Sequence, residues 1–60
     1  MNRKKEFIST KDRLLKATID LMIMKGVKAV TTREIAERAG FSEMTLFRHF
    51  KSKQRLVEAA

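Results

Sequence analysis

The chain lacks cysteine, proline, tryptophan and tyrosine, and its 60 residues include only two glycines and one histidine. Without cysteine it can form neither a disulfide nor a thiolate metal cluster, and this composition is compatible with a reducing compartment. No apolar stretch approaches the roughly 20 residues of a membrane span. No run of alternating apolar and polar residues is long enough for a strand, so the sequence predicts an all-α fold.

The residues needed for catalysis are also scarce. His49 is the only histidine, and no acidic residue stands at metal-ligand spacing with it. No glycine-rich phosphate loop is present. Ser9, Ser42 and Ser52 each precede a predicted helix, where capping explains a serine better than nucleophilic catalysis does. We therefore expect no enzyme activity, no catalytic residue, no metal and no cofactor.

Positive charge is abundant in this small chain. The formal net charge is +7 and the isoelectric point is about 10.4, which suggests a polyanionic partner, either nucleic acid or an anionic membrane. Basic residues gather at two places, Arg3–Lys5 and a later cluster. The later cluster consists of Arg48, Lys51, Lys53 and Arg55.

The first predicted helix covers residues 10–25, with Ser9 or Thr10 as its cap and Gly26 just beyond its end. Its apolar residues recur at three- and four-residue spacing and form one face. The centre of that face consists of Leu14, Ala17, Leu21 and Met24. Residues 1–9 carry charge without periodicity, and we expect them to form a flexible basic arm.

Three further helices follow a connector at residues 27–30. Thr31 and Glu34 form a capping box for a helix that Gly40 ends. A third helix begins after Ser42 and is predicted to end at Lys51. Ser52 then caps a fourth helix, whose apolar pattern is still strong where the sequence stops, so we expect the chain to be part of a longer protein.

One spacing links the second and third helices. Ala36 is followed by Gly40 after four residues and by Leu46 after six more. This pattern predicts a helix-turn-helix, which needs a small residue at the closest approach, a glycine with positive φ in the turn and an aliphatic residue between the helices. The fold class is therefore a three-helix helix-turn-helix domain at residues 10–60 with the start of a fourth helix.

The third helix has the features of a DNA recognition helix, at about residues 43–50. Leu46 and Phe50 are expected to point inward, and the remaining side chains to face outward or sideways. These are Glu43, Met44, Thr45, Phe47 and Arg48. Arginine suits guanine, and methyl-bearing groups suit the thymine methyl. Core packing is an open alternative for Met44 and for Phe47.

These residues resemble a known family. The segment 31–53, TTREIAERAGFSEMTLFRHFKSK, is similar to the DNA-binding signature of TetR-family bacterial transcriptional regulators, and residues 14–26 look like that family's first helix. The resemblance covers about residues 10–60. It implies that a larger helical domain, which binds a ligand and forms a dimer in family members, is absent from this chain.

The resemblance also implies roles for individual residues. Base-facing positions match Arg33, Glu43, Met44, Thr45 and Arg48, and positions that contact the DNA backbone match Thr32, Ser42, Phe47, His49 and Lys53. Phe47 departs from the family, which usually has a phosphate-binding tyrosine there. Its ring can instead contact a sugar or a thymine methyl.

The function predicted from the sequence is sequence-specific binding of double-stranded DNA as the reading domain of a regulator. By resemblance this regulator is a cytoplasmic bacterial repressor, a homodimer that a small-molecule effector releases from its operator. Two alternatives remain open at this point. One is a basic amphipathic helical segment on anionic membranes. The other is a helical protein-interaction module with Ile19 and Ile23 as its contact.

Overall fold

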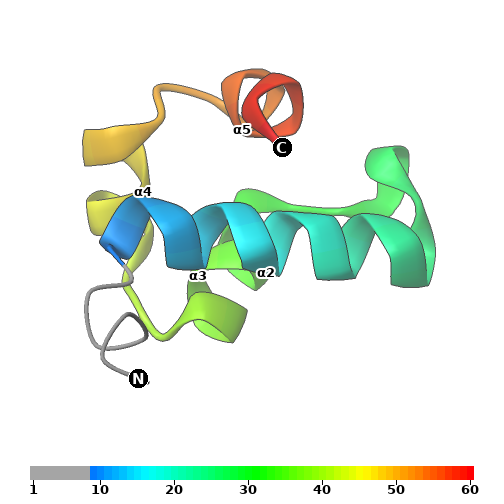
Figure 1. Ribbon diagram of the computed structural model, residues 1–60, viewed down its shortest axis with the longest axis horizontal. Coiled ribbons are helices and arrows are strands. Elements are labelled where there is room, and N and C mark those ends of the chain that lie inside the picture. Colours follow the sequence, from blue (N-terminus) through cyan, green and yellow to red (C-terminus); the bar gives the residue numbers. More distant parts are fainter. Residues whose placement is uncertain (1–8) are drawn as a thin grey trace, which may run out of the picture.

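The described part of the chain is mainly helical. The computed structural model describes residues 9–60, and within them it has four α-helices, one 3-10 turn and no strand (Figure 1). The elements are α2 (Thr10–Lys25), η1 (Val27–Ala29), α3 (Thr32–Ala39), α4 (Glu43–His49) and α5 (Lys53–Ala59). The all-α prediction, with three helices and the start of a fourth, is confirmed. The predicted basic arm lies outside the described residues except for Ser9, which caps α2.

Each helix begins at a hydroxyl side chain that satisfies a backbone N–H of the first turn. The four N-caps are Ser9, Thr31, Ser42 and Ser52. The capping box of α3 is complete, because the Glu34 N–H donates to Thr31 Oγ1 and the Thr31 N–H donates to Glu34 Oε1. Hydroxyl caps compete with helix continuation, so these residues divide the chain into short helices at fixed points.

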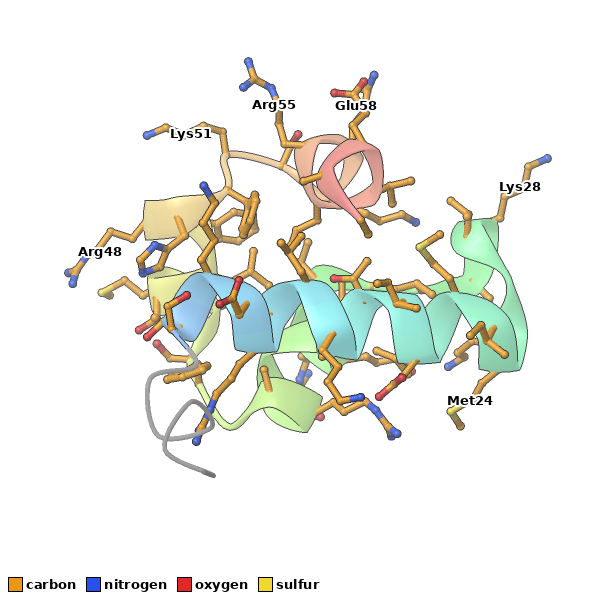
Figure 2. All side chains as sticks on the ribbon, viewed as in Figure 1. Met24, Lys28, Arg48, Lys51, Arg55 and Glu58 are labelled. Atoms are coloured by element: carbon orange, nitrogen blue, oxygen red, sulfur yellow. The ribbon has the colours of Figure 1, made fainter. Side chains whose placement is uncertain are left out.

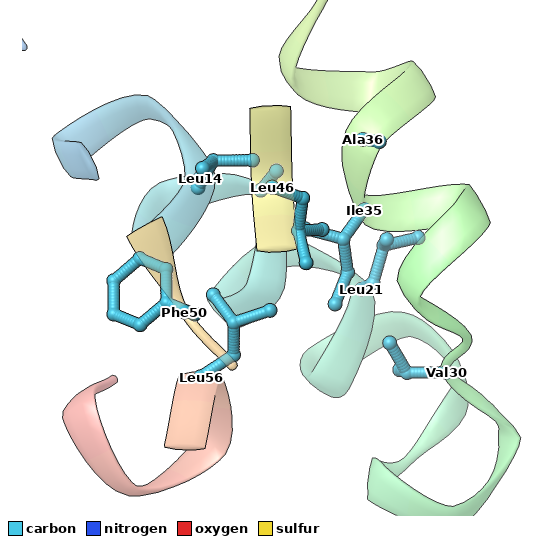
Figure 3. Packing of buried hydrophobic residues seen from close by; sticks show 9 residues of the cluster. Leu14, Leu21, Val30, Ile35, Ala36, Leu46, Phe50 and Leu56 are labelled. Carbon is cyan, nitrogen blue, oxygen red and sulfur yellow. The ribbon is translucent and has the colours of Figure 1, made fainter. Parts of the chain in front are cut away.

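All four helices contribute to one small core (Figure 3). Figure 1 shows α2 running through the middle of the molecule, with α4 near its first residues and α5 along one side. The buried apolar side chains are Leu14, Ala17, Leu21, Val30, Ile35, Ala36, Leu46, Phe50 and Leu56. Thr18 is also fully buried, and its hydroxyl donates to the Leu14 carbonyl at 2.8 Å. The core therefore lies against the first three-quarters of α2.

The turn between α3 and α4 is held by backbone bonds. Gly40 has φ 87° and ψ 26°, a left-handed conformation that favours glycine. The Phe41 N–H donates to the Ala36 carbonyl at 2.8 Å, and the Gly40 N–H donates to the Glu37 carbonyl at 3.1 Å. Ala36 is buried in the same core cluster as Leu46 of α4, as the small residue of the predicted motif requires.

The end of α4 differs from the expectation. The sequence predicted a helix ending at Lys51, but α4 ends at His49. Phe50 has extended backbone angles, φ −130° and ψ 124°, and its ring is 6% exposed. Leaving the helix at this residue turns the ring into the core, and burial of an aromatic ring outweighs two further helical residues.

Met24 was expected on the core face of α2, and this expectation is wrong. Its side chain is 65% exposed, and that of Ile23 is 78% exposed. Figure 2 shows Met24 pointing away at the end of the molecule. The core residues of α2 end at Leu21, and the last turn of the helix contacts α3 through the exposed Lys25–Glu34 pair and not through apolar side chains. A periodic apolar pattern cannot show where the partner helices end.

Candidate nucleic-acid interface

The two faces of α4 have different surroundings. Leu46 is fully buried, whereas Met44 is 71% exposed and Phe47 is 40% exposed. The core-packing alternative therefore fails for both Met44 and Phe47. Arg48 is also exposed, and its side chain extends away from the molecule at the end of α4 (Figure 2). The outward face of α4 thus carries a thioether, an aromatic ring and a guanidinium.

A hydrogen bond joins the first residues of α3 and α4. Thr32 Oγ1 donates to Glu43 Oε2 at 3.0 Å. The resemblance gave the first residue a backbone role and the second a base-facing role, and the structure brings them together. The bond occupies the single hydroxyl proton of Thr32 and leaves carboxylate lone pairs of Glu43 available. Such acceptors suit the amino group of cytosine.

The other hydroxyls at the start of α4 are paired within the helix. Ser42 Oγ accepts from the Thr45 N–H at 3.2 Å and lies 3.2 Å from Thr45 Oγ1. Ser42 is exposed and Thr45 is partly buried. These bonds fix the orientation of both side chains at one end of the outward face.

Arg33 lies on α3 and forms an i,i+4 ion pair with Glu37, at 3.5 Å. The two side chains are 77% and 66% exposed. An exposed pair of this kind is weak, about 0.3–0.5 kcal/mol, so the guanidinium can exchange its partner at little cost. Arg33 remains a predicted base contact.

Lys53 makes a contact that the sequence did not indicate. Its ammonium donates to the Val30 carbonyl at 2.7 Å, across 23 residues of sequence. Val30 is a buried residue of the connector before α3. One of the three ammonium donors is used, and two remain for a phosphate. The bond fixes the side chain before any ligand binds, and it ties α5 to the start of α3.

Other cations lie near α4 over aromatic rings. The Lys11 ammonium is 5.8 Å from the centre of the Phe50 ring, and the Arg13 guanidinium is 6.0 Å from that of Phe41. Sequence reasoning placed no functional residue at the start of α2. The charge of Lys11 was visible, but its approach to α4 depends on how the helices cross.

One carboxyl group at the contact between α2 and α3 has a lowered pKa. The Lys25 ammonium donates a hydrogen bond to Glu34, and the Thr31 N–H donates a second. The Lys25 bond is the main cause that lowers the pKa of Glu34 below its ordinary value. This pair joins the last turn of α2 to the first turn of α3.

Within residues 9–60, no helix combines the length and the apolar character needed to cross a membrane. The same residues bring together no group of three or more histidine and acidic side chains able to hold a metal ion.

The comparisons with known proteins agree on one family. The family model described as "Bacterial regulatory proteins, tetR family" matches residues 14–60. An uncharacterized HTH-type transcriptional regulator, YvkB of Bacillus subtilis (strain 168), is 56% identical over 83% of the chain and 26% of its own length. No solved structure gave a significant match.

Two named repressors are also similar. The HTH-type transcriptional repressor KstR2 of Mycolicibacterium smegmatis is 42% identical over 83% of the chain and 24% of its own length. The class A tetracycline repressor from transposon 1721 in Escherichia coli is 39% identical over 77% of the chain and 21% of its own length. The chain spans about a quarter of the length of these relatives. It belongs to the tetR family of bacterial regulatory proteins and corresponds to that family's N-terminal DNA-binding domain.

Proposed function

We propose that this chain binds double-stranded DNA sequence-specifically, with residues 43–50 as the recognition helix in the major groove. The observation that carries the proposal is the split of α4 into a buried face at Leu46 and an exposed face at Met44, Phe47 and Arg48. A recognition helix needs its inner face fixed by the domain and its outer side chains free for base edges.

The contacts divide into two kinds. Base edges meet Glu43, Met44 and Arg48, with further proposed contacts from Thr45 and from Arg33 on α3. Arg48 suits the acceptors of guanine, and the Met44 side chain suits the thymine methyl. These contacts select the sequence.

Backbone contacts set the position of the domain on DNA without reading sequence. We assign them to Thr32, Ser42, Phe47, His49 and Lys53. For Thr32 this requires that its hydroxyl exchanges the bond to Glu43 for one to a phosphate oxygen when DNA binds. The Val30 bond supports the assignment of Lys53, because a side chain held in place loses less conformational entropy when it meets a phosphate. Phe47 has no hydroxyl, so its contact is with sugar or a thymine methyl.

The function of the whole regulator is a separate part of the proposal. We infer that residues 10–60 form the DNA-binding domain of a longer cytoplasmic protein, a homodimeric repressor that leaves its operator when a small molecule binds elsewhere. The names of KstR2 and of the tetracycline repressor support repression. Its support is similarity to these relatives, and no residue of this chain carries it.

A binding titration of the 60-residue chain at several salt concentrations tests the DNA proposal. The probes are a duplex selected from random DNA and a scrambled duplex of the same composition. We expect preference for the selected duplex and a slope of log K against log salt of roughly −2 to −5, since each neutralised phosphate contributes about −0.9. Equal binding of both duplexes, or a slope near zero, contradicts the proposal.

A further inference from the structure

A cationic groove lies beside the recognition helix, between the start of α2, the end of α4 and α5. Lys11, Lys51 and Arg55 line it together with His49, and Phe50 is also part of its wall. The three charged side chains come from α2, from the link after α4 and from α5, and all are exposed. None of them is assigned a DNA contact above. We infer that this groove binds a phosphate of the DNA backbone next to the major groove read by α4, an inference that rests on the proposed function.

The described residues form no ion pair with the cations of this groove. Within residues 9–60, none of Lys11, Lys51 and Arg55 forms an ion pair with a carboxylate. Glu58 is the one acidic residue in the lining, and it accepts a hydrogen bond from Gln54 at 3.3 Å. Among residues 9–60, the groove therefore presents three cations beside the single carboxylate of Glu58.

A second groove, between α2 and α3, shows the contrast. It is lined by Arg13, Lys16, Asp20 and Arg38 among others, and Asp20 pairs with Arg38 at 3.5 Å. Of its three cations Arg38 is therefore already paired, and a cation paired with a carboxylate gains less from a phosphate. The groove at Lys51 is thus the better phosphate site of the two.

The groove also adjoins the proposed reading surface. Figure 2 shows Lys51 and Arg48 extending from the same end of the molecule, with Arg55 next to them on α5. His49, which lines the groove, directly follows Arg48 in α4. The Lys11 ammonium, 5.8 Å from the centre of the Phe50 ring, brings the start of α2 to the same place. A DNA strand that borders the groove read by Arg48 passes close to these cations.

Salt dependence separates a direct phosphate contact from a general effect of charge. Lys51→Gln should reduce the steepness of the salt slope by about 0.9, and Lys51→Gln with Arg55→Gln by about 1.8. Both variants should weaken the selected and the scrambled duplex by the same factor, because a phosphate carries no sequence information. Lys28→Gln is the matched control, since Lys28 is exposed and lies at the opposite end of the molecule (Figure 2). It should leave the slope unchanged.

The Glu58→Gln variant gives a further test, because its expected effect is tighter binding and a folding defect would weaken binding. Removing this carboxylate from the groove should strengthen binding to both duplexes, whereas a damaged domain binds more weakly. Circular dichroism of each variant checks that helix content is retained. A Glu58→Gln variant that binds no more tightly than the wild type contradicts the inference.

Neutral methylphosphonate linkages, placed one at a time along the selected duplex, locate the phosphate. At one linkage beside the recognition site, neutralisation should weaken wild-type binding but cause no further loss in the Lys51→Gln, Arg55→Gln double variant. If the losses of affinity caused by the neutral linkage and by the double substitution add up at every position, the inferred phosphate site is wrong.

The wild-type titration tells the two proposals apart. If the wild type binds with a steep salt slope and the double variant has the same slope, the phosphate site in the groove is wrong but the proposed function stands. The same conclusion follows if Lys28→Gln changes the salt slope as much as Lys51→Gln does. If the wild-type chain binds neither duplex, both the proposed function and the inferred phosphate site are wrong.

Discussion

The two ends of α2 lie in opposite surroundings. Toward its start, Leu14 and Ala17 are buried in the core cluster that also contains Leu46 of α4 (Figure 3). At its end, Ile23 and Met24 are 78% and 65% exposed. A domain of this size has little apolar surface to bury, and this chain uses it to hold the helix-turn-helix. The apolar pattern of a helix alone therefore does not show which of its residues are buried. Burial depends on which other elements cover each part of the helix.

The largest change in stability is expected for a substitution in the buried core, and a substitution at the exposed end of α2 is the comparison. Leu46→Ala should lower the free energy of unfolding by about 2–5 kcal/mol, because it leaves a cavity in a fully buried site. Ile23→Ala, at the exposed end, should change it by no more than about 0.5 kcal/mol. Urea unfolding followed by circular dichroism measures both. Similar losses would mean that the end of α2 is covered in solution.

The two glycines differ in backbone conformation. Gly26 follows the exposed end of α2, and Gly40 lies in the turn between α3 and α4. Gly40 has left-handed angles that asparagine also tolerates, whereas Gly26 has φ 84° and ψ 154°, a region almost restricted to glycine. Gly26→Asn should cost about 1–3 kcal/mol of stability. Gly40→Val should cost more than about 1 kcal/mol, and Gly40→Asn less than Gly40→Val.

Thermal melting of these three glycine variants gives the ranking. If Gly40→Val melts like the parent, the turn between α3 and α4 does not adopt the left-handed angles described here.

Two lysines separated by one residue should behave differently. Lys53→Met removes the donor to the Val30 carbonyl and should cost stability toward the lower end of about 1–3 kcal/mol, because the bond is only partly buried. Lys51→Met removes an exposed ammonium that bonds to no residue in the range 9–60, and should leave the free energy of unfolding nearly unchanged. Equal effects in chemical denaturation would show that the Val30 bond does not form in solution.

The smallest effect is a dependence on pH at the contact between α2 and α3. The folded-state pKa of Glu34 is lowered, so its contribution to stability is complete above the unfolded pKa and is lost as the pH falls through the folded pKa. The wild type should therefore lose stability on acidification more steeply than Glu34→Gln. Glu37→Gln, which changes an exposed carboxylate on the same helix, is the control. Parallel pH curves for wild type and Glu34→Gln would contradict the assignment.

The sequence predicted what local rules determine. Hydroxyl caps and glycines marked the starts of the helices and the end of α3, and the family resemblance placed the proposed contacts on α4. Local rules missed the end of α4, because the burial of Phe50 in the core cluster is a tertiary effect. They also missed the Lys53–Val30 and Thr32–Glu43 bonds. These bonds join elements whose approach depends on the packed fold, and no spacing along the chain encodes them.

We propose that the exposed face of α4 reads bases, and substitution of Arg48 tests this proposal. Binding of wild type, Arg48→Ala and Lys51→Ala should be measured on the selected duplex and on its scrambled counterpart. Arg48→Ala is expected to reduce the preference for the selected duplex by about 1–3 kcal/mol, while Lys51→Ala weakens both duplexes and preserves the preference. An Arg48→Ala variant that keeps the full wild-type preference would contradict the account.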